Sequence, residues 1–145
     1  MVAVPLHQLD PDLPVPGYAH PGDAGADLYA REDAHLACGG GRALVPTGIV
    51  VALPVGFGGF VLPRSGLALR HGVTCLNTPG LVDPGYRGEL AVLLVNTDPS
   101  EDYEVRRGDR IAQLVLAPVA RALYDELPAL DPTVRAGGGF GSTGG

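Results

Sequence analysis

Glycine and proline interrupt this chain so often that it favours short elements joined by tight turns. The sequence contains 22 Gly and 14 Pro among its 145 residues. That share is typical of disordered chains, but here it coexists with apolar runs and a hydrophobic content of 46%. Short strands connected by turns satisfy both observations. We therefore expect one all-β domain, a sandwich or barrel of short strands.

Apolar runs between the turns predict the individual elements. The run Leu90–Val95 is apolar without alternation, which is typical of a strand covered on both faces. The only convincing helical stretch in the first two thirds of the chain is Ser65–Arg70, with Ser65 as a good N-cap. Further strands are expected at 43–53 around the turn Pro46-Thr47-Gly48, and at 56–62, 73–76, 103–105 and 111–119.

Composition excludes several classes of protein. A net charge of −6 argues against a general nucleic-acid or acidic-membrane surface. All ten basic residues are Arg, so a few arginines at particular positions would have to bind an anionic ligand.

The sequence shows no apolar run of about 18 residues and no leader, so we expect no membrane span and a cytoplasmic protein. Cys38 and Cys75 have no metal or redox spacing and are expected to be reduced core thiols.

The composition changes near the C-terminal end of the chain. We expect residues 1–130 to form the β domain and residues 131–145 to be a Gly-rich segment of the same domain. Residues 137–145 are nearly all Gly, Ser and Thr around Phe140. By composition alone, this segment is typical of a flexible tail.

The tetrapeptide Pro63-Arg64-Ser65-Gly66 is a candidate phosphate site at the start of the predicted helix. A helix N-terminus offers unpaired N–H groups to an anion, and Arg64 adds a planar fork of donors that suits phosphate. Taken alone, however, the tetrapeptide favours a capped helix with a solvated arginine.

The segment Asn77–Glu89 carries three different polar groups close together. Asp83-Pro84-Gly85 alone favours an ordinary turn, since Asp suits its first position and Pro its second. Asn77 and Tyr86 add an amide and a phenol ring to this carboxylate. We expect a hairpin flanked by apolar strands, which could place the three groups around one small ligand.

Five segments, taken in order, are similar to the five motifs of the trimeric dUTP diphosphatase family. Together they extend from residue 24 to residue 144, and their joint occurrence is far more specific than any one of them. Ala136 departs from the pattern, because it stands where Gly is common in the last motif. The segments are Ala24–Leu28, Pro63–Ala68, Asn77–Glu89, Arg107–Leu114 and Arg135–Gly144.

This resemblance implies a jelly-roll-like β fold and a homotrimer whose active sites are shared between subunits. It also implies an enzyme that hydrolyses dUTP to dUMP and pyrophosphate with Mg²⁺, removing dUTP and supplying dUMP for thymidylate synthesis. We expect water to attack the α-phosphorus in line without a covalent enzyme intermediate, because no Ser-His or Cys-His set lies near the motifs.

The resemblance assigns roles to the residues that would face the nucleoside. Asp83 resembles the general base that holds and activates the attacking water. Asn77 and the backbone around Leu81 and Val82 would read the edge of uracil in a pocket too tight for the methyl group of thymine. Tyr86 would pack against the deoxyribose and leave no space for a 2′-hydroxyl group.

The resemblance also assigns roles along the phosphate chain. Arg64, Ser65, Gly66 and Gln113 resemble the residues that hold the phosphates. Asp27 resembles a carboxylate that steadies Mg²⁺ through water, which suits an ion that keeps much of its hydration shell. The Gly-rich C-terminal segment would close over the nucleotide as a lid, with Phe140 stacked on uracil. The other lid residues expected to bind substrate are Arg135, Gly141, Ser142 and Thr143.

Three alternatives stand beside this interpretation. A dCTP deaminase shares the fold and a similar hairpin, but that family carries a catalytic Glu where this chain has Leu93 and Leu94. A non-catalytic nucleotide-binding or regulatory protein could bind dUTP on the same scaffold, yet it could lack Asp83 or the lid. A jelly-roll sugar binder is a weaker alternative, because the Arg, Gln and Gly positions suit phosphates.

Overall fold

The computed structural model describes residues 1–133 and 136–137, which form short strands and one helix. In chain order the elements are β1 (Leu6–Gln8), β2 (Ala26–Tyr29), β3 (Ala34–Leu36), β4 (Arg42–Pro46), β5 (Ile49–Val51), β6 (Phe57–Leu62), α1 (Ser65–His71), β7 (Val73–Cys75), β8 (Gly80–Val82), β9 (Ala91–Asn96), β10 (Tyr103–Val105) and β11 (Arg110–Pro118). The predicted strands at 43–53, 56–62, 73–76, 103–105 and 111–119 are confirmed within a few residues, with 43–53 divided at its turn into β4 and β5.

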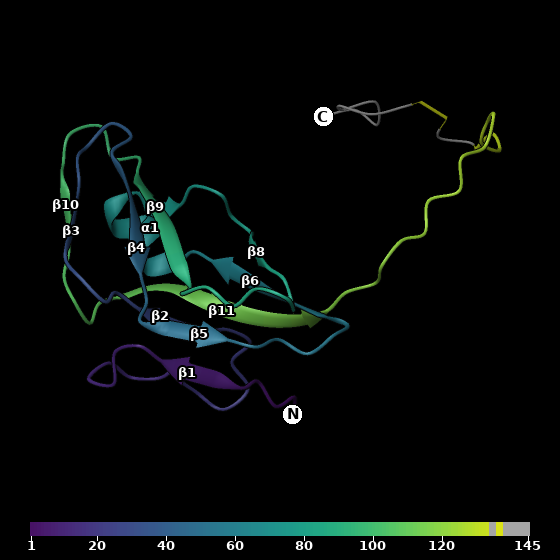
Figure 1. Ribbon diagram of the computed structural model, residues 1–145. Helices are drawn as coiled ribbons and strands as arrows, with labels where there is room; N and C mark the ends of the chain where they lie inside the picture. The colour runs from purple at the N-terminus through teal and green to yellow at the C-terminus, as the bar shows by residue number, and fades with distance from the viewer. Residues whose placement is uncertain (134–135, 138–145) are drawn as a thin grey trace.

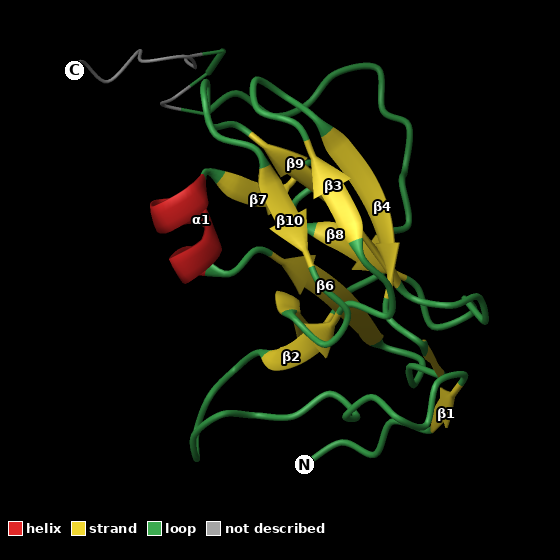
Figure 2. Ribbon diagram, turned by 90° about the vertical axis from the view of Figure 1, so that its left-hand side faces the viewer, coloured by secondary structure: helices red, strands yellow, loops and turns green. Residues whose placement is uncertain are grey.

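Two antiparallel sheets form the body of the molecule. One sheet contains β2, β11, β6 and β8 in this order, and the other contains β4, β9 and β7. Figure 1 shows the first sheet below the second, and Figure 2 shows α1 at one side of the body, next to β7. The pairs β1–β5 and β3–β10 add two small sheets. The jelly-roll-like, all-β fold expected from the sequence is confirmed.

Aliphatic side chains fill the core between the sheets. Complete burial of one such side chain contributes about 1.5–3 kcal/mol to the free energy of unfolding. β9 lies in the middle of its sheet and is mostly buried, as its continuous apolar run predicted, although Leu93 is only half-buried. The large aliphatic residues that are at most 1% exposed include Leu28, Leu36, Val45, Leu94 and Ile111.

Helix α1 begins where the sequence predicted, but its cap is different. The N-cap position is Arg64, which is extended with φ −94° and ψ 124° and makes no side-chain capping bond. Ser65 is the first helical residue, so the prediction that it caps the helix is wrong. The physical reason is that Arg64 still continues the extended path of β6. Gly72 ends the helix with φ 63°, and its N–H donates to the carbonyl of Ala68.

The strands that flank segment 77–89, β7 and β9, pair antiparallel as expected for a hairpin, but the segment between them takes a longer path than the sequence suggested. Its one strand, β8, pairs with β6 and places Gly80 opposite Val61. The chain therefore crosses from β7 in one sheet to β8 at the edge of the other sheet, and then returns to β9. The turn at Asp83 is confirmed, because the N–H of Tyr86 donates to the Asp83 carbonyl at 3.1 Å.

The two cysteines lie in different surroundings, and both are free. Cys75 is 2% exposed, and burial raises the pKa of its thiol to about 11, as expected for a core cysteine. Cys38 is only half-buried, so the prediction that it belongs to the core is wrong. Its backbone N–H donates to the Asp102 carboxylate at 2.8 Å, which keeps this loop at the surface. Within the described residues, no helix is long and apolar enough to cross a membrane.

Asn96 is a buried polar residue that ties three parts of the fold together. It is 0% exposed, and its Nδ2 donates to the carbonyls of Leu36 at 3.1 Å and Glu101 at 2.8 Å. Its Oδ1 accepts the N–H of Asp98 at 2.9 Å. The end of β9 is thereby fixed to β3 and to the turn before β10.

We expect the substitution Asn96→Ala to lower the free energy of unfolding by about 2–4 kcal/mol, because it leaves buried backbone groups unpaired. Urea denaturation at a fixed protein concentration measures this loss. Ser100→Ala is the matched control, since Ser100 is exposed and its hydroxyl contacts only Asp98 in the same turn. A loss for Asn96→Ala no larger than that of the control would contradict the prediction.

Candidate functional site

Four of the five motifs meet on one sheet because β11 pairs with a strand on either side. Gln113 of β11 lies opposite Asp27 of β2 and also opposite Leu62 of β6. Side chains of directly opposite residues point to the same face of a sheet. Arg64 follows Leu62 by two positions and reaches this face as well. The third motif joins through β8, which pairs with the other edge of β6.

Asp27 lies between two arginines at the centre of this arrangement. It is 7% exposed, and its Oδ1 lies 3.2 Å from Nε of Arg64. Its Oδ2 lies 3.3 Å from Nη1 of Arg110. Nε of Arg64 is buried and has no well-oriented hydrogen-bond partner, so its contact with Asp27 is mainly electrostatic. One carboxylate facing two guanidinium groups leaves an excess of positive charge, which suits an anion.

Gln113 packs directly over the first motif. A Cβ atom on Gly25 would lie 2.5 Å from Oε1 of Gln113, so a larger residue here would displace the amide of Gln113. Ser65 and Gly66 follow Arg64 in the first turn of α1, Ser65 exposed and Gly66 half-buried. The structure therefore brings Asp27, Arg64 and Gln113 together, with Ser65 and Gly66 next to Arg64 in the chain.

Arg110 belongs to this cluster, although no role was expected for it from the sequence. Strict alternation along a strand would place Arg110 and Gln113 on opposite faces of the sheet. A β-bulge between Arg110 and Ala112 shifts the register by one residue. Because of this shift, both Arg110 and Gln113 lie on the face that carries Asp27. The Arg107-Gly108-Asp109 turn before the strand is a signal for an irregular start, but it does not reveal the bulge itself.

A second group of predicted residues lines a cavity of about 280 Å³. These residues come from the turn before β8, from β8 itself and from the turn that follows it, and Asp83 and Tyr86 are exposed to solvent. The peptide bond between Thr78 and Pro79, just before β8, is cis. The predicted residues that line the cavity are Asn77, Leu81, Val82, Asp83 and Tyr86.

Hydrogen bonds within segment 77–89 hold its turn in one shape. Nη1 of Arg87 donates to the carbonyl of Pro84 at 2.6 Å and to that of Tyr86 at 2.7 Å. The hydroxyl of Tyr86 donates to the carbonyl of Glu89 at 2.9 Å. The carboxylate of Asp83 and the ring of Tyr86 are therefore presented from a stiff support.

The opposite wall of the cavity is apolar and was not foreseen from the sequence. It includes Leu44 of β4 and Leu93 of β9, and Leu44 is 66% exposed. Leu93 stands where the deaminase alternative requires an acidic side chain, and it lines this cavity with an aliphatic one. The exposure of Leu44 is a property of the folded strand, so nothing in the apolar stretch around it indicated this wall in advance.

The two groups of residues do not share a cavity in the described part of the chain. Asp27, Arg64 and Gln113 are absent from the lining of the cavity that contains Asp83. The predicted lid residues Arg135, Phe140, Gly141, Ser142 and Thr143 lie outside the described residues.

The side chains around Asp27 suit a metal ion that contacts the protein through water rather than by direct coordination. In residues 1–133 and 136–137, no group of three or more His, Cys, Asp or Glu side chains could hold a metal ion. Asp27 is a single carboxylate with an arginine at each oxygen. This arrangement fits an ion that is held mainly by phosphate oxygens and touches Asp27 through water.

Comparison with known proteins gives a consistent result. The family model of dUTPase matches residues 12–144 of this chain. A deoxyuridine 5′-triphosphate nucleotidohydrolase from Thermobifida fusca is 59% identical over 144 residues, which cover 99% of this chain and 80% of that protein. The protein of the same name from Rhodococcus erythropolis is 54% identical over 99% of this chain and 87% of its own length.

Solved structures show the same fold. The dUTPase of Staphylococcus bacteriophage 80alpha with dUPNHPP matches with a TM-score of 0.85, and 99% of each chain is covered at 24% identity. A mutant dUTPase from phage phi11 of S. aureus, with a structural Mg(II) ion, matches with a TM-score of 0.78 at 22% identity. That match covers 88% of this chain and 98% of the phage protein.

The positive excess around Asp27 predicts that a small polyanion stabilises the protein. We expect inorganic pyrophosphate, in buffer with EDTA, to raise the melting temperature of the wild type by binding the folded state. Arg64→Met should reduce that rise by about half or more, because the rise depends on affinity for the folded state. Arg106→Met is the matched control, since Arg106 pairs with Asp33 and Glu104 away from this cluster. An equal rise in the wild type and in Arg64→Met would contradict the prediction.

Proposed function

The chain belongs to the dUTPase family and is a dUTP diphosphatase, and we propose that Asp83 is the general base of its reaction. Hydrolysis of dUTP yields dUMP and pyrophosphate. Support for the role of Asp83 comes from the cavity in which its carboxylate, the amide of Asn77 and the ring of Tyr86 meet. A proton acceptor, a hydrogen-bonding amide and a flat ring around one small volume suit a nucleoside with a water molecule beside it.

Asp83 would hold the attacking water and accept its proton as the oxygen approaches the α-phosphorus. The pyrophosphate group leaves from the opposite side of the phosphorus, and no bond forms between the enzyme and the nucleotide. A base contributes most when its position is fixed before the reaction. The turn that carries Asp83 meets this condition, because Tyr86 and Arg87 brace it through backbone carbonyls.

We propose that the same cavity selects both the base and the sugar. Asn77 and the backbone around Leu81 and Val82 would bind the polar edge of uracil, and a thymine methyl group would clash with the cavity wall. Tyr86 would lie against the deoxyribose, where a 2′-hydroxyl group would have no room. The apolar wall of Leu44 and Leu93 adds a nonpolar surface against which the uracil ring and the deoxyribose would pack.

The phosphate chain would bind at the excess positive charge around Asp27. Arg64 can supply two donors to phosphate oxygens, and Ser65, Gly66 and Gln113 can add neutral donors. Mg²⁺ bound to the triphosphate would neutralise charge that develops on the leaving group. Asp27 would contact that ion through water, as the two flanking arginines leave little space for direct ligation.

Residues 131–145 are proposed to close over the nucleotide as a lid. In this proposal Phe140 stacks on uracil, and Gly141 lets the backbone approach closely. Arg135, Ser142 and Thr143 would reach the phosphates. A cytoplasmic location, and a supply of dUMP for thymidylate synthesis, are part of the same proposal.

We further propose a homotrimer with shared active sites. The residues proposed to bind the nucleoside and those proposed to bind the phosphates lie in separate places in one chain. A second copy of the chain can bring the two sets together. After β11 the chain leaves the body of the molecule (Figure 1). This stretch carries large apolar side chains that would be covered by another copy. They are Leu123, Tyr124, Leu127 and Leu130, from 56% to 98% exposed.

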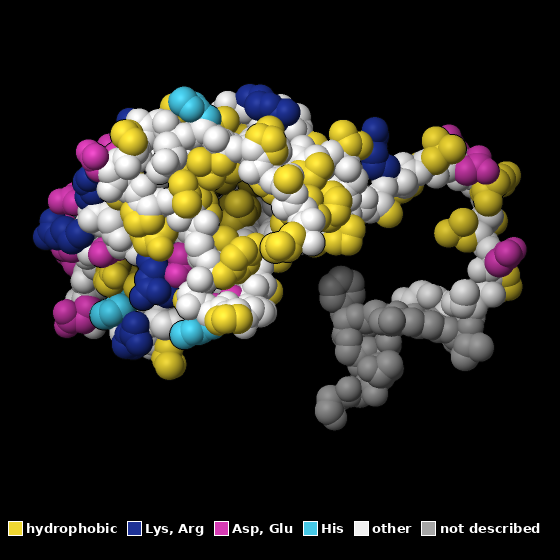
Figure 3. All heavy atoms as spheres, turned by 90° about the horizontal axis from the view of Figure 1, so that it is seen from below, with side chains coloured by type: hydrophobic (Ala, Val, Ile, Leu, Met, Phe, Trp, Pro, Cys, Tyr) yellow, Lys and Arg dark blue, Asp and Glu magenta, His cyan; other side chains and the backbone are white. Residues whose placement is uncertain are grey.

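A second apolar surface supports the assembly. A hollow of about 400 Å³ lies between β1, the N-terminal residues and β11. Its lining is aliphatic apart from Tyr18, and hydrophobic side chains gather around a hollow on the face shown in Figure 3. An exposed apolar hollow with a polar rim is typical of a surface that another protein chain covers. Contact between copies would cover it.

The first measurement is pyrophosphate release from dUTP, dTTP, dCTP and UTP with Mg²⁺. We expect release almost only from dUTP, and a loss of about 100-fold or more in kcat for Asp83→Asn, because the amide cannot accept the proton. Binding of a non-hydrolysable dUTP analogue should persist in this variant, which separates loss of chemistry from loss of folding. Near-normal turnover by Asp83→Asn would remove Asp83 as the base, and ammonia released from dCTP would favour a deaminase.

Shared sites predict that two inactive variants complement each other. One variant carries Asp83→Asn, and the other lacks residues 134–145. Co-expressed in equal amounts, they should form mixed trimers in which about a quarter of the sites are complete, if each site combines Asp83 of one chain with the lid of another. Light scattering of the full-length protein alone should give a mass of three times 14.9 kDa. A monomeric mass, or no activity in the mixture, would contradict shared sites.

A further inference from the structure

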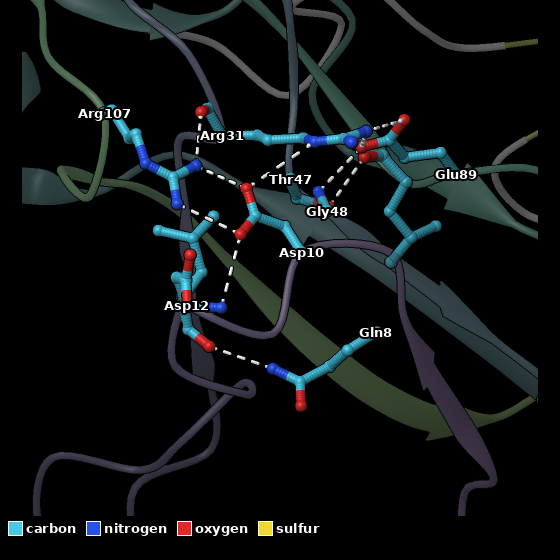
Figure 4. Close-up of polar contacts among 10 residues, drawn as sticks. Gln8, Asp10, Asp12, Arg31, Thr47, Gly48, Glu89 and Arg107 are labelled. Atoms are coloured by element: carbon cyan, nitrogen blue, oxygen red, sulfur yellow. Dashed lines mark hydrogen bonds and ion pairs between the residues drawn. The ribbon is translucent and has the colours of Figure 1, made fainter.

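Glu89, the last residue of segment 77–89, fixes this segment to a network of ion pairs (Figure 4). Its Oε1 accepts the N–H of Gly48 at 2.7 Å. Nη1 of Arg31 lies 3.3 Å from both oxygens of the carboxylate. The side chain of Glu89 is 26% exposed, so this pair is partly shielded from water and stronger than an open surface pair.

Arg31 is itself held from its other side. Nη1 of Arg107 donates to the carbonyl of Arg31 at 2.9 Å. The guanidinium of Arg107 also binds the carboxylate of Asp10 through its two terminal nitrogens, with Nη2 at 3.0 Å from Oδ1. Nε of Arg31 lies 3.7 Å from Asp10. Glu89, Arg31, Arg107 and Asp10 thus come from four distant stretches of chain and form one continuous network.

Gly48 lies inside the network and gives Glu89 a rigid partner. Its φ of +75° is left-handed, and a Cβ atom at this position would lie 2.9 Å from Cβ of Asp10. Its carbonyl accepts the N–H of Leu9 at 2.7 Å, while its own N–H faces Glu89. Because the N–H and the carbonyl of Gly48 are both engaged, the N–H that binds Glu89 has a fixed position.

The carboxylate of Glu89 restrains the residues before it rather than the strand after it. Leu90 is held by backbone bonds, since its N–H donates to Ile49 at 2.8 Å and its carbonyl accepts the N–H of Thr47 at 3.0 Å. The start of β9 therefore does not need the Glu89 side chain. What the side chain adds is a tether at the end of the turn that carries Asp83.

Tyr86 depends on this end of the segment. Its hydroxyl donates to the backbone carbonyl of Glu89 at 2.9 Å, which sets the tilt of the ring. The ring lies directly over Gly88, where a Cβ atom would be 2.4 Å from the hydroxyl oxygen. A shift of Glu89 would therefore move Tyr86 within the cavity that both Tyr86 and Asp83 line.

We propose that Glu89, held by Arg31, is a positioning residue that sets the selectivity for deoxyribose by fixing the ring of Tyr86. This inference rests on the proposed function of Tyr86 as the surface that excludes a 2′-hydroxyl group. It assigns a specificity role to a side chain that does not touch the nucleotide. Arg107 and Asp10 hold Arg31 in place from the side opposite Glu89.

The test compares kcat/KM for dUTP with kcat/KM for UTP in Glu89→Ala, Glu89→Gln and Arg31→Met. We expect the ratio of the two values to fall about tenfold in Glu89→Ala, because small displacements of a positioned group have large kinetic effects. Glu89→Gln keeps an acceptor for Gly48 and should lose less. Arg31→Lys should restore most of the ratio that Arg31→Met loses, since it keeps the charge.

The controls separate positioning from stability. Arg106→Met removes an arginine from an exposed ion pair next to the network and should leave the ratio unchanged. Unchanged selectivity in Glu89→Ala, even where the variant unfolds at a lower urea concentration, would overturn the proposal. A proportional loss of activity towards both nucleotides would overturn it as well.

A measurement without nucleotide distinguishes this inference from the proposed function. Amide hydrogen exchange in segment 77–89 should become faster in Glu89→Ala than in the wild type, and remain unchanged in Arg106→Met. Unchanged exchange in Glu89→Ala would show that the tether does not restrain the segment. Failure of the wild type to hydrolyse dUTP would overturn the proposed function and with it the selectivity role, whereas faster exchange would still support the tether.

Discussion

β11 hydrogen-bonds along both of its edges, and the chemistry of one half of the site depends on the register of these bonds. On one side Gln113 lies opposite Asp27, and on the other side it lies opposite Leu62, two residues before Arg64. A slip of one residue would turn these side chains to the other face of the sheet. The bulge after Arg110 belongs to the same constraint, since it turns a second guanidinium towards Asp27.

The other half of the site obeys a different constraint, which is the path of segment 77–89 between the sheets. Only β8 is held by a ladder of backbone bonds, and it lies at the edge of its sheet. The rest of the segment takes its shape from side chains that bind backbone carbonyls and from the pairing of Glu89 with Arg31. A binding surface built in this way combines polar groups on a loop with an apolar wall on rigid strands, a common design for ligand sites.

Local sequence signals carried most of the fold, because Gly and Pro mark the turns and apolar runs mark the strands. They also placed Asn77, Asp83 and Tyr86 in one segment, which the structure brings to one cavity. These local signals do not predict which distant strands pair with each other. The partner of β8 is β6 rather than a neighbour in a hairpin, and the bulge that redirects Arg110 belongs to the pairing of β11 with β2. The contact of Glu89 with Arg31 joins residues 58 positions apart, so no local pattern reports it.

The pair of Asp10 and Arg107 has a consequence for how this enzyme responds to acid and alkali. The hydrogen bond from Arg107 lowers the pKa of Asp10, and the same bond raises the pKa of Arg107. The stability that Asp10 contributes is lost only as the pH falls through its lowered pKa, and that of Arg107 only as the pH rises through its raised pKa. Between the ordinary pKa of a carboxylate and that of a guanidinium, both groups stay charged. A pH–rate profile measured within this interval therefore contains no contribution from a loosening of this pair.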